Sequence, residues 1–196
     1  MQQNAFLQTI CANPEDDAPR LVYADWLDER GNPLGEFIRV QVELARIKES
    51  RPRYGMLRAR QLELMLAHVP LWVQPYGMQI LGAEFKRGFM CAGTVETELL
   101  VKDQPWFERW PWEVLRLRNT DWYFNALLDC RLLARLKMLD LSRTRLEDYQ
   151  MAALARSDVL RYVRWIELGN NIPSSSVTAD LLRAFGDNVR WSRRWR

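Results

Sequence analysis

The sequence predicts an α/β protein in which an N-terminal helical module precedes a short array of β-α units around a parallel sheet. Two observations predict this class. Apolar residues recur at helical spacing up to Pro70 and then, from about Met78, fall into short runs typical of strands. Farther along, three segments repeat one pattern of paired aliphatic residues, which indicates successive strands of the same kind.

Residues 1–50 predict three helices. The first spans Gln3–Ala12, and the third spans Pro33 to about Ser50, with apolar residues recurring every three or four positions. The second begins near Pro19, because a proline suits the first turn of a helix, where its missing N–H costs nothing. Gly31 follows the last periodic residue of this helix, as a left-handed C-terminal cap requires.

The second helix contains two large aromatic residues, and a cluster of carboxylates precedes it. We expect Tyr23 and Trp26 to be buried between the three helices, although Trp26 could instead face a ligand. The carboxylates of Glu15, Asp16 and Asp17 precede the helix and are expected to cap it and to complement its dipole. Binding of a divalent ion is the weaker alternative, because adjacent side chains on a cap point in different directions.

Two stretches of this region, NPEDDAPRLVYADWLDERG at Asn13–Gly31 and EFIR at Glu36–Arg39, lie within a run from Phe6 to Gln41 that resembles a known family. That family is the bacterial repeat-companion domain, a short module found upstream of leucine-rich repeats, chiefly in planctomycetes and myxobacteria. EFKRGFM at Glu84–Met90 also resembles the Arg-Gly-Phe stretch that follows the module in its family. The resemblance implies a helical module joined to repeats, and it implies no catalytic residue, because the family has no established activity.

A fourth helix and a pair of strands are predicted next. The helix covers about Tyr54–His68 and is expected to stop at Pro70. Met78–Phe85 and Phe89–Val95 contain β-favouring residues in short runs on either side of a Lys-Arg-Gly turn. This segment therefore predicts two strands joined by a tight turn.

Three aligned segments, EVLRLRNT, KMLDLSRT and RWIELGNN, predict the repeats. Leu115 and Leu139 stand 24 residues apart, Leu139 and Ile166 stand 27 apart, and each is followed two positions later by a leucine. This pattern is the signature of leucine-rich repeats, which are about 20 to 29 residues long. Helical stretches are expected over Phe124–Leu136 and Glu147–Tyr162. A generic α/β domain with a parallel sheet is the alternative.

The predicted domains are a repeat-companion helical module at 1–50, a connecting helix and loop at 51–77, and a leucine-rich-repeat-like α/β array with a C-terminal cap at 78–196. A fourth unit of this array is expected to start around Thr94-Val95 and to use Trp106-Phe107 as its filler on the helical side. At 196 residues, with 48% hydrophobic and 27% charged residues, the chain has the composition of an ordinary globular protein.

Other features of the sequence exclude several classes. No apolar run is long enough to span a membrane and the N-terminus lacks the regions of a signal peptide, so we expect a cytoplasmic protein. Cys11, Cys91 and Cys130 are odd in number and show no CxxC spacing, and His68 is the single histidine, so neither disulfides nor a zinc site is expected. The net charge of +3 combines an acidic N-terminal segment with a basic C-terminal half.

The sequence contains no recognised catalytic motif. Ser174-Ser175-Ser176 predicts a turn rather than a nucleophile elbow, and GxSxG, phosphate-binding glycine-loop and HExxH motifs are all missing. We therefore predict that the protein is not an enzyme and has no catalytic residues, no metal site, no cofactor and no small-molecule substrate.

Two function classes remain. The first is a protein-interaction or scaffold module that binds a protein partner through the strand face of the repeats or through the flanking helices. We expect the charged residues that alternate with the strand leucines to lie on the exposed side of the sheet and to meet this partner. They are Arg116, Arg118, Asp140, Arg143, Arg164 and Glu167.

The alternative is an accessory nucleic-acid-binding protein that uses the basic C-terminal half. Arginine and tryptophan interleave in the tail, where a possible edge for an anionic partner consists of Arg190, Arg193, Arg194, Trp195 and Arg196. The same tail is expected to cap the last repeat through Leu181, Leu182, Phe185, Val189 and Trp191. Whether the basic residues bind nucleic acid or the tail only caps the array is left open by the sequence.

Overall fold

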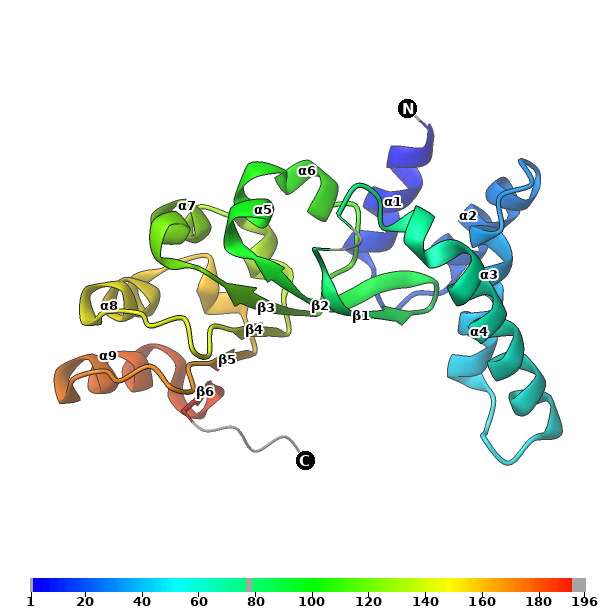
Figure 1. The fold of residues 1–196 in the computed structure, drawn as a ribbon. Coiled ribbons are helices and arrows are strands. Elements are labelled where there is room, and N and C mark those ends of the chain that lie inside the picture. Colours follow the sequence, from blue (N-terminus) through cyan, green and yellow to red (C-terminus); the bar gives the residue numbers. More distant parts are fainter. Residues whose placement is uncertain (1, 77–78, 192–196) are drawn as a thin grey trace. The chain divides into compact units, whose positions relative to one another are not determined.

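The computed structural model describes residues 2–76 and 79–191 (Figure 1). Four helices come first: α1 (Gln2–Ala12), α2 (Ala18–Asp28), α3 (Leu34–Arg46) and α4 (Pro52–Trp72). The strands are β1 (Leu81–Lys86), β2 (Phe89–Glu96), β3 (Val114–Arg118), β4 (Met138–Asp140), β5 (Trp165–Glu167) and β6 (Val189–Arg190). The later helices are α5 (Thr97–Lys102), α6 (Gln104–Phe107), α7 (Phe124–Leu128), α8 (Asp148–Arg156) and α9 (Ser175–Phe185).

The described residues therefore form an α/β structure with helices before the strands, as the sequence predicts at this coarse level. The six-stranded sheet is mixed, whereas a parallel sheet was predicted. The strand order is β1-β2-β3-β4-β5-β6, which follows the chain. Within the described part of the chain, no helix is long and apolar enough to cross a membrane.

The chain divides into two compact units, which differ from the predicted domains. Unit 1 contains the described residues up to Gln79, and it includes the predicted connecting segment 51–77. The β1–β2 hairpin is shared between the units. Unit 1 also takes Glu84–Cys91 and Arg109–Pro111, whereas unit 2 takes Ile80–Ala83, Ala92–Glu108 and the described residues from Trp112 onward.

In unit 1, α2 has the predicted start and end. Pro19 lies in its first turn, and Gly31 beyond its end has a φ of +63°, a conformation that glycine adopts without steric cost. The rings of Tyr23 and Trp26 pack against each other and against Phe6, with centroids 5.4 to 5.8 Å apart. Tyr23 is buried as expected, but Trp26 is only half-buried.

Helix α4 packs on α3 around a small apolar cluster. Phe37, Val40 and Leu64 are buried at its centre. The expectation that Pro70 stops this helix is wrong, because α4 continues to Trp72. Proline removes one backbone donor, and so close to the end of a helix this loss affects only the last turn.

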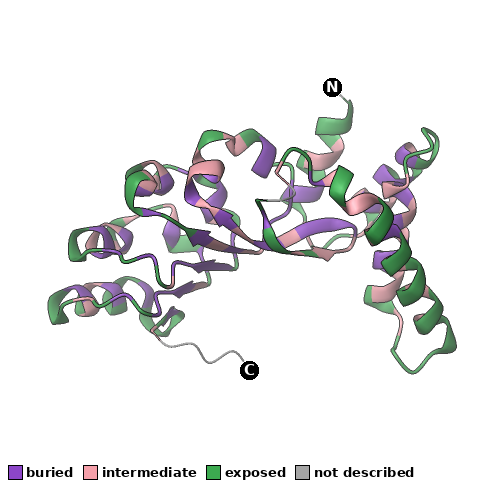
Figure 2. Ribbon diagram, in the orientation of Figure 1, coloured by how far each residue is buried: buried purple, intermediate pink, exposed green. Residues whose placement is uncertain are grey.

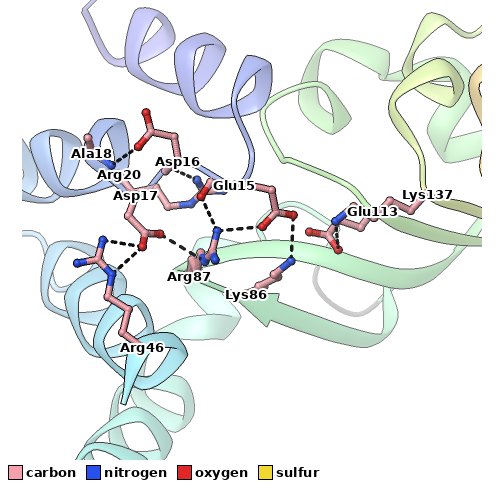
Figure 3. Close-up of polar contacts among 10 residues, drawn as sticks. All are labelled: Glu15, Asp16, Asp17, Ala18, Arg20, Arg46, Lys86, Arg87, Glu113 and Lys137. Atoms are coloured by element: carbon pink, nitrogen blue, oxygen red, sulfur yellow. Dashed lines mark hydrogen bonds and ion pairs between the residues drawn. The ribbon is translucent and has the colours of Figure 1, made fainter. Parts of the chain in front are cut away.

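The acidic segment before α2 has two different roles, which Figure 3 shows. Asp16 acts as the expected cap, since its Oδ1 accepts the backbone N–H of Ala18 at 2.9 Å. Asp17 makes no such bond and instead forms ion pairs with arginine side chains from other elements of unit 1. Its Oδ2 accepts from Nε of Arg46 at 2.9 Å, and its Oδ1 lies 3.3 Å from Nε of Arg87. The expectation that all of these carboxylates cap α2 is therefore corrected for Asp17.

Arg20 of α2 is buried beside these residues, with 2% of its surface exposed. One of its Nη atoms donates to the backbone oxygen of Asp16 at 2.7 Å, and its guanidinium lies 5.6 Å from the centroid of the Phe89 ring. Burial, and next the nearby charge of Arg87, lower the pKa of Arg20. Arg87 in turn forms an ion pair of 3.1 Å with Glu15. These contacts fasten the hairpin turn to the helices of unit 1.

Unit 2 contains a run of parallel strands in register. Leu115 pairs with Leu139, and Leu139 pairs with Ile166, so the three positions aligned in the sequence are direct neighbours across the sheet. Val95 of β2 pairs with Leu117 in the same way, and the parallel pairing of β2 with β3 extends from Ala92 to Glu96. In Figure 1 the helices α7, α8 and α9 lie on one side of these strands. Leu115, Leu139 and Ile166 are fully buried.

The two helices predicted between these strands are each broken. The first is divided into α7 and a 3-10 turn at Arg131–Arg135, because Cys130 between them is extended, with a ψ of 104°. Leu127, Cys130, Leu132 and Leu133 are all buried, and one continuous helix would direct them to different sides. The second is divided in the same way into α8 and a 3-10 turn at Leu160–Tyr162.

The turns after β3, β4 and β5 share one backbone conformation. A residue with positive φ follows two positions after the second leucine of each strand segment: Asn119 (50°), Arg143 (63°) and Asn170 (63°). The next residue in each turn is polar and buried: Thr120, Thr144 and Asn171. The similarity between the three segments therefore extends beyond the leucines to the turns.

The predicted C-terminal cap is present in part. Leu181 and Phe185 of α9 are buried, and Val189 of β6 pairs with Ile166. Leu182, which was expected in the cap, is 45% exposed. Its position on the helix therefore directs it away from the last strands.

Candidate protein-interaction surface

Along each strand of unit 2, successive side chains point to opposite faces of the sheet. The paired leucines face the helices, so the residues that alternate with them share the opposite side. We call this side the strand face, and on β3 to β6 it consists of Val114, Arg116, Arg118, Met138, Asp140, Trp165, Glu167 and Arg190.

The register arranges the charged members of the strand face in one line across the sheet. In the register of the strands, Arg116 lies opposite Asp140, Asp140 lies opposite Glu167, and Glu167 lies opposite Arg190. The Nε atom of Arg116 lies 3.9 Å from Oδ2 of Asp140. Two carboxylates therefore lie between two arginines, on strands that lie about 4.8 Å apart.

The two carboxylates are not available to a partner, which corrects the expectation that they lie on the exposed side. Asp140 is 8% exposed and Glu167 is 3% exposed. Each turns toward the backbone of the turn that follows its strand: Oδ1 of Asp140 accepts the N–H of Ser142 at 2.9 Å, and Oε1 of Glu167 accepts the N–H of Gly169 at 3.2 Å. Their role is to satisfy backbone donors that the positive-φ turns leave near the sheet.

The predicted arginines of this surface reach solvent. Arg118, Arg143, Arg164 and Arg190 are exposed, and Arg116 is half-buried. Arg143 is anchored through its backbone, because its N–H donates to the carbonyl oxygen of Gly169 at 2.8 Å while the side chain extends into solvent. The accessible charge among the predicted residues is therefore positive, although the line of residues in the sheet contains both signs.

Trp165 is a strand-face residue that the sequence analysis did not single out. Its ring is half-buried, with the guanidinium of Arg190 4.1 Å and that of Arg164 5.8 Å from its centroid. Both distances lie within the range of cation–π attraction. Alternation with Ile166 could have placed Trp165 on this face, but its contact with Arg190 depends on the pairing of β5 with β6.

A further ion pair borders this region. Nζ of Lys137 lies 3.2 Å from Oε2 of Glu113, between the segments that lead into β4 and β3 (Figure 3). Of the predicted edge for an anionic partner, only Arg190 is described. Arg193, Arg194, Trp195 and Arg196 lie outside the described residues.

Two observations concern possible metal ligands and reactive thiols in the described residues. Within residues 2–76 and 79–191, no group of three or more histidine, cysteine, aspartate or glutamate side chains is placed to hold a metal ion. Cys11, Cys91 and Cys130 form no disulfide bond among the described residues, and burial raises the pKa of Cys130, which disfavours its reactive thiolate form.

Comparison of the chain with protein-family models, with curated proteins and with solved structures found no match.

Proposed function

We propose that this chain is a non-catalytic protein-interaction module that binds an acidic surface of a partner protein through the strand face of unit 2. In this proposal unit 2 is a leucine-rich-repeat-like array. Unit 1 is a helical module of the repeat-companion type.

Several features support the repeat assignment. The aligned positions of three segments are register partners, and the turns after them repeat a positive φ followed by a buried polar residue. Helices lie on one side of the strands and leave the other side to a partner, which is how repeat arrays form binding surfaces. The Glu84–Cys91 segment of unit 1 supports the companion assignment, because it contains the Arg-Gly-Phe stretch that the resemblance relates to the helical module.

The observation that carries the binding proposal is the separation of charge on the strand face. Its carboxylates, Asp140 and Glu167, are buried against backbone N–H groups, while Arg118 and Arg190 are exposed. Trp165, which Arg190 covers, adds a large half-buried aromatic ring. Arginine and tryptophan are the residue types enriched in the energetic centres of protein interfaces. A partner with carboxylates around an apolar group would complement this surface.

A nucleic acid is the second candidate, because the same exposed arginines could bind phosphates. The protein partner is preferred because two carboxylates, Asp140 and Glu167, lie between Arg116 and Arg190, so the described arginines of the strand face are not continuous across the sheet. The two candidates predict different responses in a binding experiment, and both depend on Arg118 and Arg190.

The test compares two charge reversals of equal size. Arg118→Glu with Arg190→Glu changes the strand face, whereas Arg131→Glu with Arg156→Glu changes exposed arginines on the helical side. Each immobilised variant is incubated with an extract of the cells that produce the protein, and bound proteins are quantified by mass spectrometry. We expect partners that the wild type and the helical-side variant capture and the strand-face variant loses.

Equal capture by both variants would contradict the proposal. In parallel, fluorescence anisotropy measures binding of the wild type to single-stranded RNA and duplex DNA near 50 mM salt, where phosphate contacts are strong. Salt-sensitive binding that the strand-face variant loses would favour the nucleic-acid candidate. A wild type that binds neither polymer removes that candidate.

A further inference from the structure

Arg190 lies opposite a carboxylate in the sheet but packs on an aromatic ring. Its register partner is Glu167, whose Oε1 accepts the backbone N–H of Gly169 at 3.2 Å. The guanidinium carbon of Arg190 lies 4.1 Å from the centroid of the ring of Trp165, a half-buried residue of β5 (Figure 2). Arg190 is exposed, and no side chain among the described residues forms an ion pair with it. The guanidinium is therefore held by the ring and not by an acid group.

The donors of this guanidinium remain available to a partner. A guanidinium this close to an aromatic ring packs on it through its flat face, so the N–H groups at its edge stay free. The ring also restricts the conformations of a long side chain that would otherwise be mobile on the surface. Arg190 therefore combines unused donors in a rigid fork with a lowered entropic cost of binding, and both properties suit a receptor for an anionic group.

The other charges near the ring leave Arg190 without a counter-ion. Arg164 is also exposed, and its guanidinium lies 5.8 Å from the same centroid. Lys137, in the adjoining strand segment, is paired with Glu113 at 3.2 Å. Asp187, in the turn before β6, is exposed and forms no ion pair with a described residue. The exposed, unpaired charges around the ring are thus two arginines and one aspartate, so the surface has an excess of one positive charge.

An apolar strip crosses the sheet beside Arg190. Val114, Met138 and Trp165 are neighbours in the register of β3, β4 and β5. Val114 and Trp165 are half-buried, so part of each side chain reaches the surface, whereas Met138 between them is 7% exposed. A partner that places an acid group on Arg190 therefore meets apolar surface directly beside it.

We propose that Arg190 is the anchor of the strand face: it binds one aspartate or glutamate carboxylate of the protein partner, while an apolar side chain next to that acid group lies on the strip. Arginine binds a carboxylate through two parallel N–H···O bonds, and Trp165 is the positioning residue that holds the fork in place. The inference rests on the proposed binding of an acidic partner by the strand face, and it specifies where the acid group binds. A single excess charge fits one carboxylate, whereas a nucleic acid requires successive phosphate contacts.

The first experiment measures carboxylate binding directly, by NMR of the isotope-labelled full-length chain. Two dipeptides with blocked termini, Glu-Leu and Gln-Leu, are titrated separately, and they differ only in the acid group. The side-chain Nε–H signal of Arg190 is identified by its absence in Arg190→Lys. The Glu-Leu dipeptide is expected to shift this signal in a saturable way, and the Gln-Leu dipeptide is expected to leave it in place, because an amide does not offer two acceptor oxygens to the fork.

The second experiment repeats the capture of partners with single variants. Arg190→Lys keeps the charge but removes the fork, and it should reduce capture by at least about tenfold. Trp165→Phe keeps an aromatic face and should retain most of the capture, whereas Trp165→Leu should lose as much as Arg190→Lys. Arg131→Lys, at an exposed arginine on the helical side, is the matched control and should capture as the wild type does. Because Arg190 is exposed, Arg190→Lys decides the question even if Trp165→Leu has a lowered melting temperature.

The outcomes separate failure of this inference from failure of the proposed function. Partners that the charge reversal of Arg118 and Arg190 loses but that Arg190→Lys captures in full would keep the strand face as the binding surface and remove the carboxylate anchor. A charge reversal without effect on capture would remove both. Equal shifts with the two dipeptides, or a shift of the Arg190 signal with single-stranded RNA but not with Glu-Leu, would overturn the assignment of a carboxylate to this site.

Discussion

The backbone N–H of Gly88 donates to Oε1 of Gln41 at 2.6 Å, and this bond joins the hairpin turn to α3 within unit 1. Gln41 is buried and also donates from its Nε2 to the carbonyl oxygen of Phe85. One glutamine side chain therefore satisfies a donor and an acceptor of the hairpin backbone. The hairpin backbone approaches α3 so closely at Gly88 that a Cβ atom built there would lie 2.7 Å from Cα of Ile38. This position therefore favours glycine.

Gly88→Ala should lower the free energy of unfolding by about 2 to 4 kcal/mol, because φ is +88° at this position and the added methyl group meets the backbone of α3. Urea unfolding followed by circular dichroism measures this change. Gly31→Ala is the matched control, with a φ of +63° and open space around its Cβ position, and it should cost only about 1 to 2 kcal/mol. Equal losses in the two variants would show that the contact with Ile38 does not constrain the turn.

The three thiols should differ in reactivity toward a disulfide reagent such as DTNB. Cys91 is half-buried and should react first in the native protein, whereas Cys130 is fully buried and should react only on unfolding. The raised pKa of Cys130 acts in the same direction, because the thiolate is the attacking species. Cys91→Ser should remove the fast phase, and Cys11→Ser should leave it. Mass spectrometry that finds early modification of Cys130 would contradict its buried position.

The pairing of Glu36 with Arg60 should contribute to stability in a pH-dependent way. Hydrogen bonds from Arg60 hold the pKa of Glu36 below its ordinary value of 4.5. For a carboxylate with a lowered pKa in the folded state, the stabilisation is present above pH 4.5 and is lost as the pH falls through the folded pKa. Glu36→Gln should therefore lower the melting temperature at pH 6, and its difference from the wild type should shrink as the pH falls through the folded pKa of Glu36.

The companion variant Arg60→Gln tests whether this effect belongs to the pair. Arg60 also donates to Glu63, so its removal should cost at least as much as the loss of Glu36. The double variant should cost less than the two single changes added together, because each single change already breaks the pair. Melting temperatures recorded from pH 3 to pH 6 that stay parallel for wild type and Glu36→Gln would refute the linkage.

The sequence predicted the elements whose pattern is repeated along the chain. Leu115, Leu139 and Ile166 could be aligned because aliphatic residues at a period of two indicate strands with one buried face, and the sheet pairs them directly. The break at Cys130 could not be predicted in this way. A run of leucines around it satisfies a helical pattern, and only the packing shows that all of them must face one core.

The candidate surfaces were predictable to a smaller extent. Alternation placed Asp140 and Glu167 on the strand face correctly, but it carries no information about burial. Their carboxylates are buried because the turns after β4 and β5 direct backbone N–H groups toward them, and those turns contain residues with positive φ that are not glycine. The exposed apolar residues of α4, among them Met56, Leu62 and Leu66, were missed for a related reason. A helix with apolar residues on two sides does not reveal which side its neighbour covers.

Asn171 gives the most direct test of the repeated turns. Its Nδ2 donates to the carbonyl oxygens of Leu141 at 2.9 Å and Leu168 at 3.1 Å, and its Oδ1 accepts the N–H of Leu146 at 2.8 Å. The side chain therefore joins the turn after β5 to the turn after β4. Because all three backbone groups are in buried hydrogen bonds, Asn171→Ala should lower the free energy of unfolding by about 2 to 4 kcal/mol.

Two comparisons separate this role from a general effect of losing an asparagine. Asn125→Ala, at an exposed position of α7, should change the free energy of unfolding by less than about 0.5 kcal/mol. Asn171→Asp keeps the acceptor for Leu146 but replaces the amide donor with a carboxylate that faces two carbonyl oxygens, so it should destabilise the protein at neutral pH and less so under acid. Amide hydrogen exchange gives the local readout: protection of the Leu146 N–H should fall in Asn171→Ala and persist in Asn125→Ala. Loss of protection in neither variant would mean that the side chain of Asn171 does not hold successive turns together.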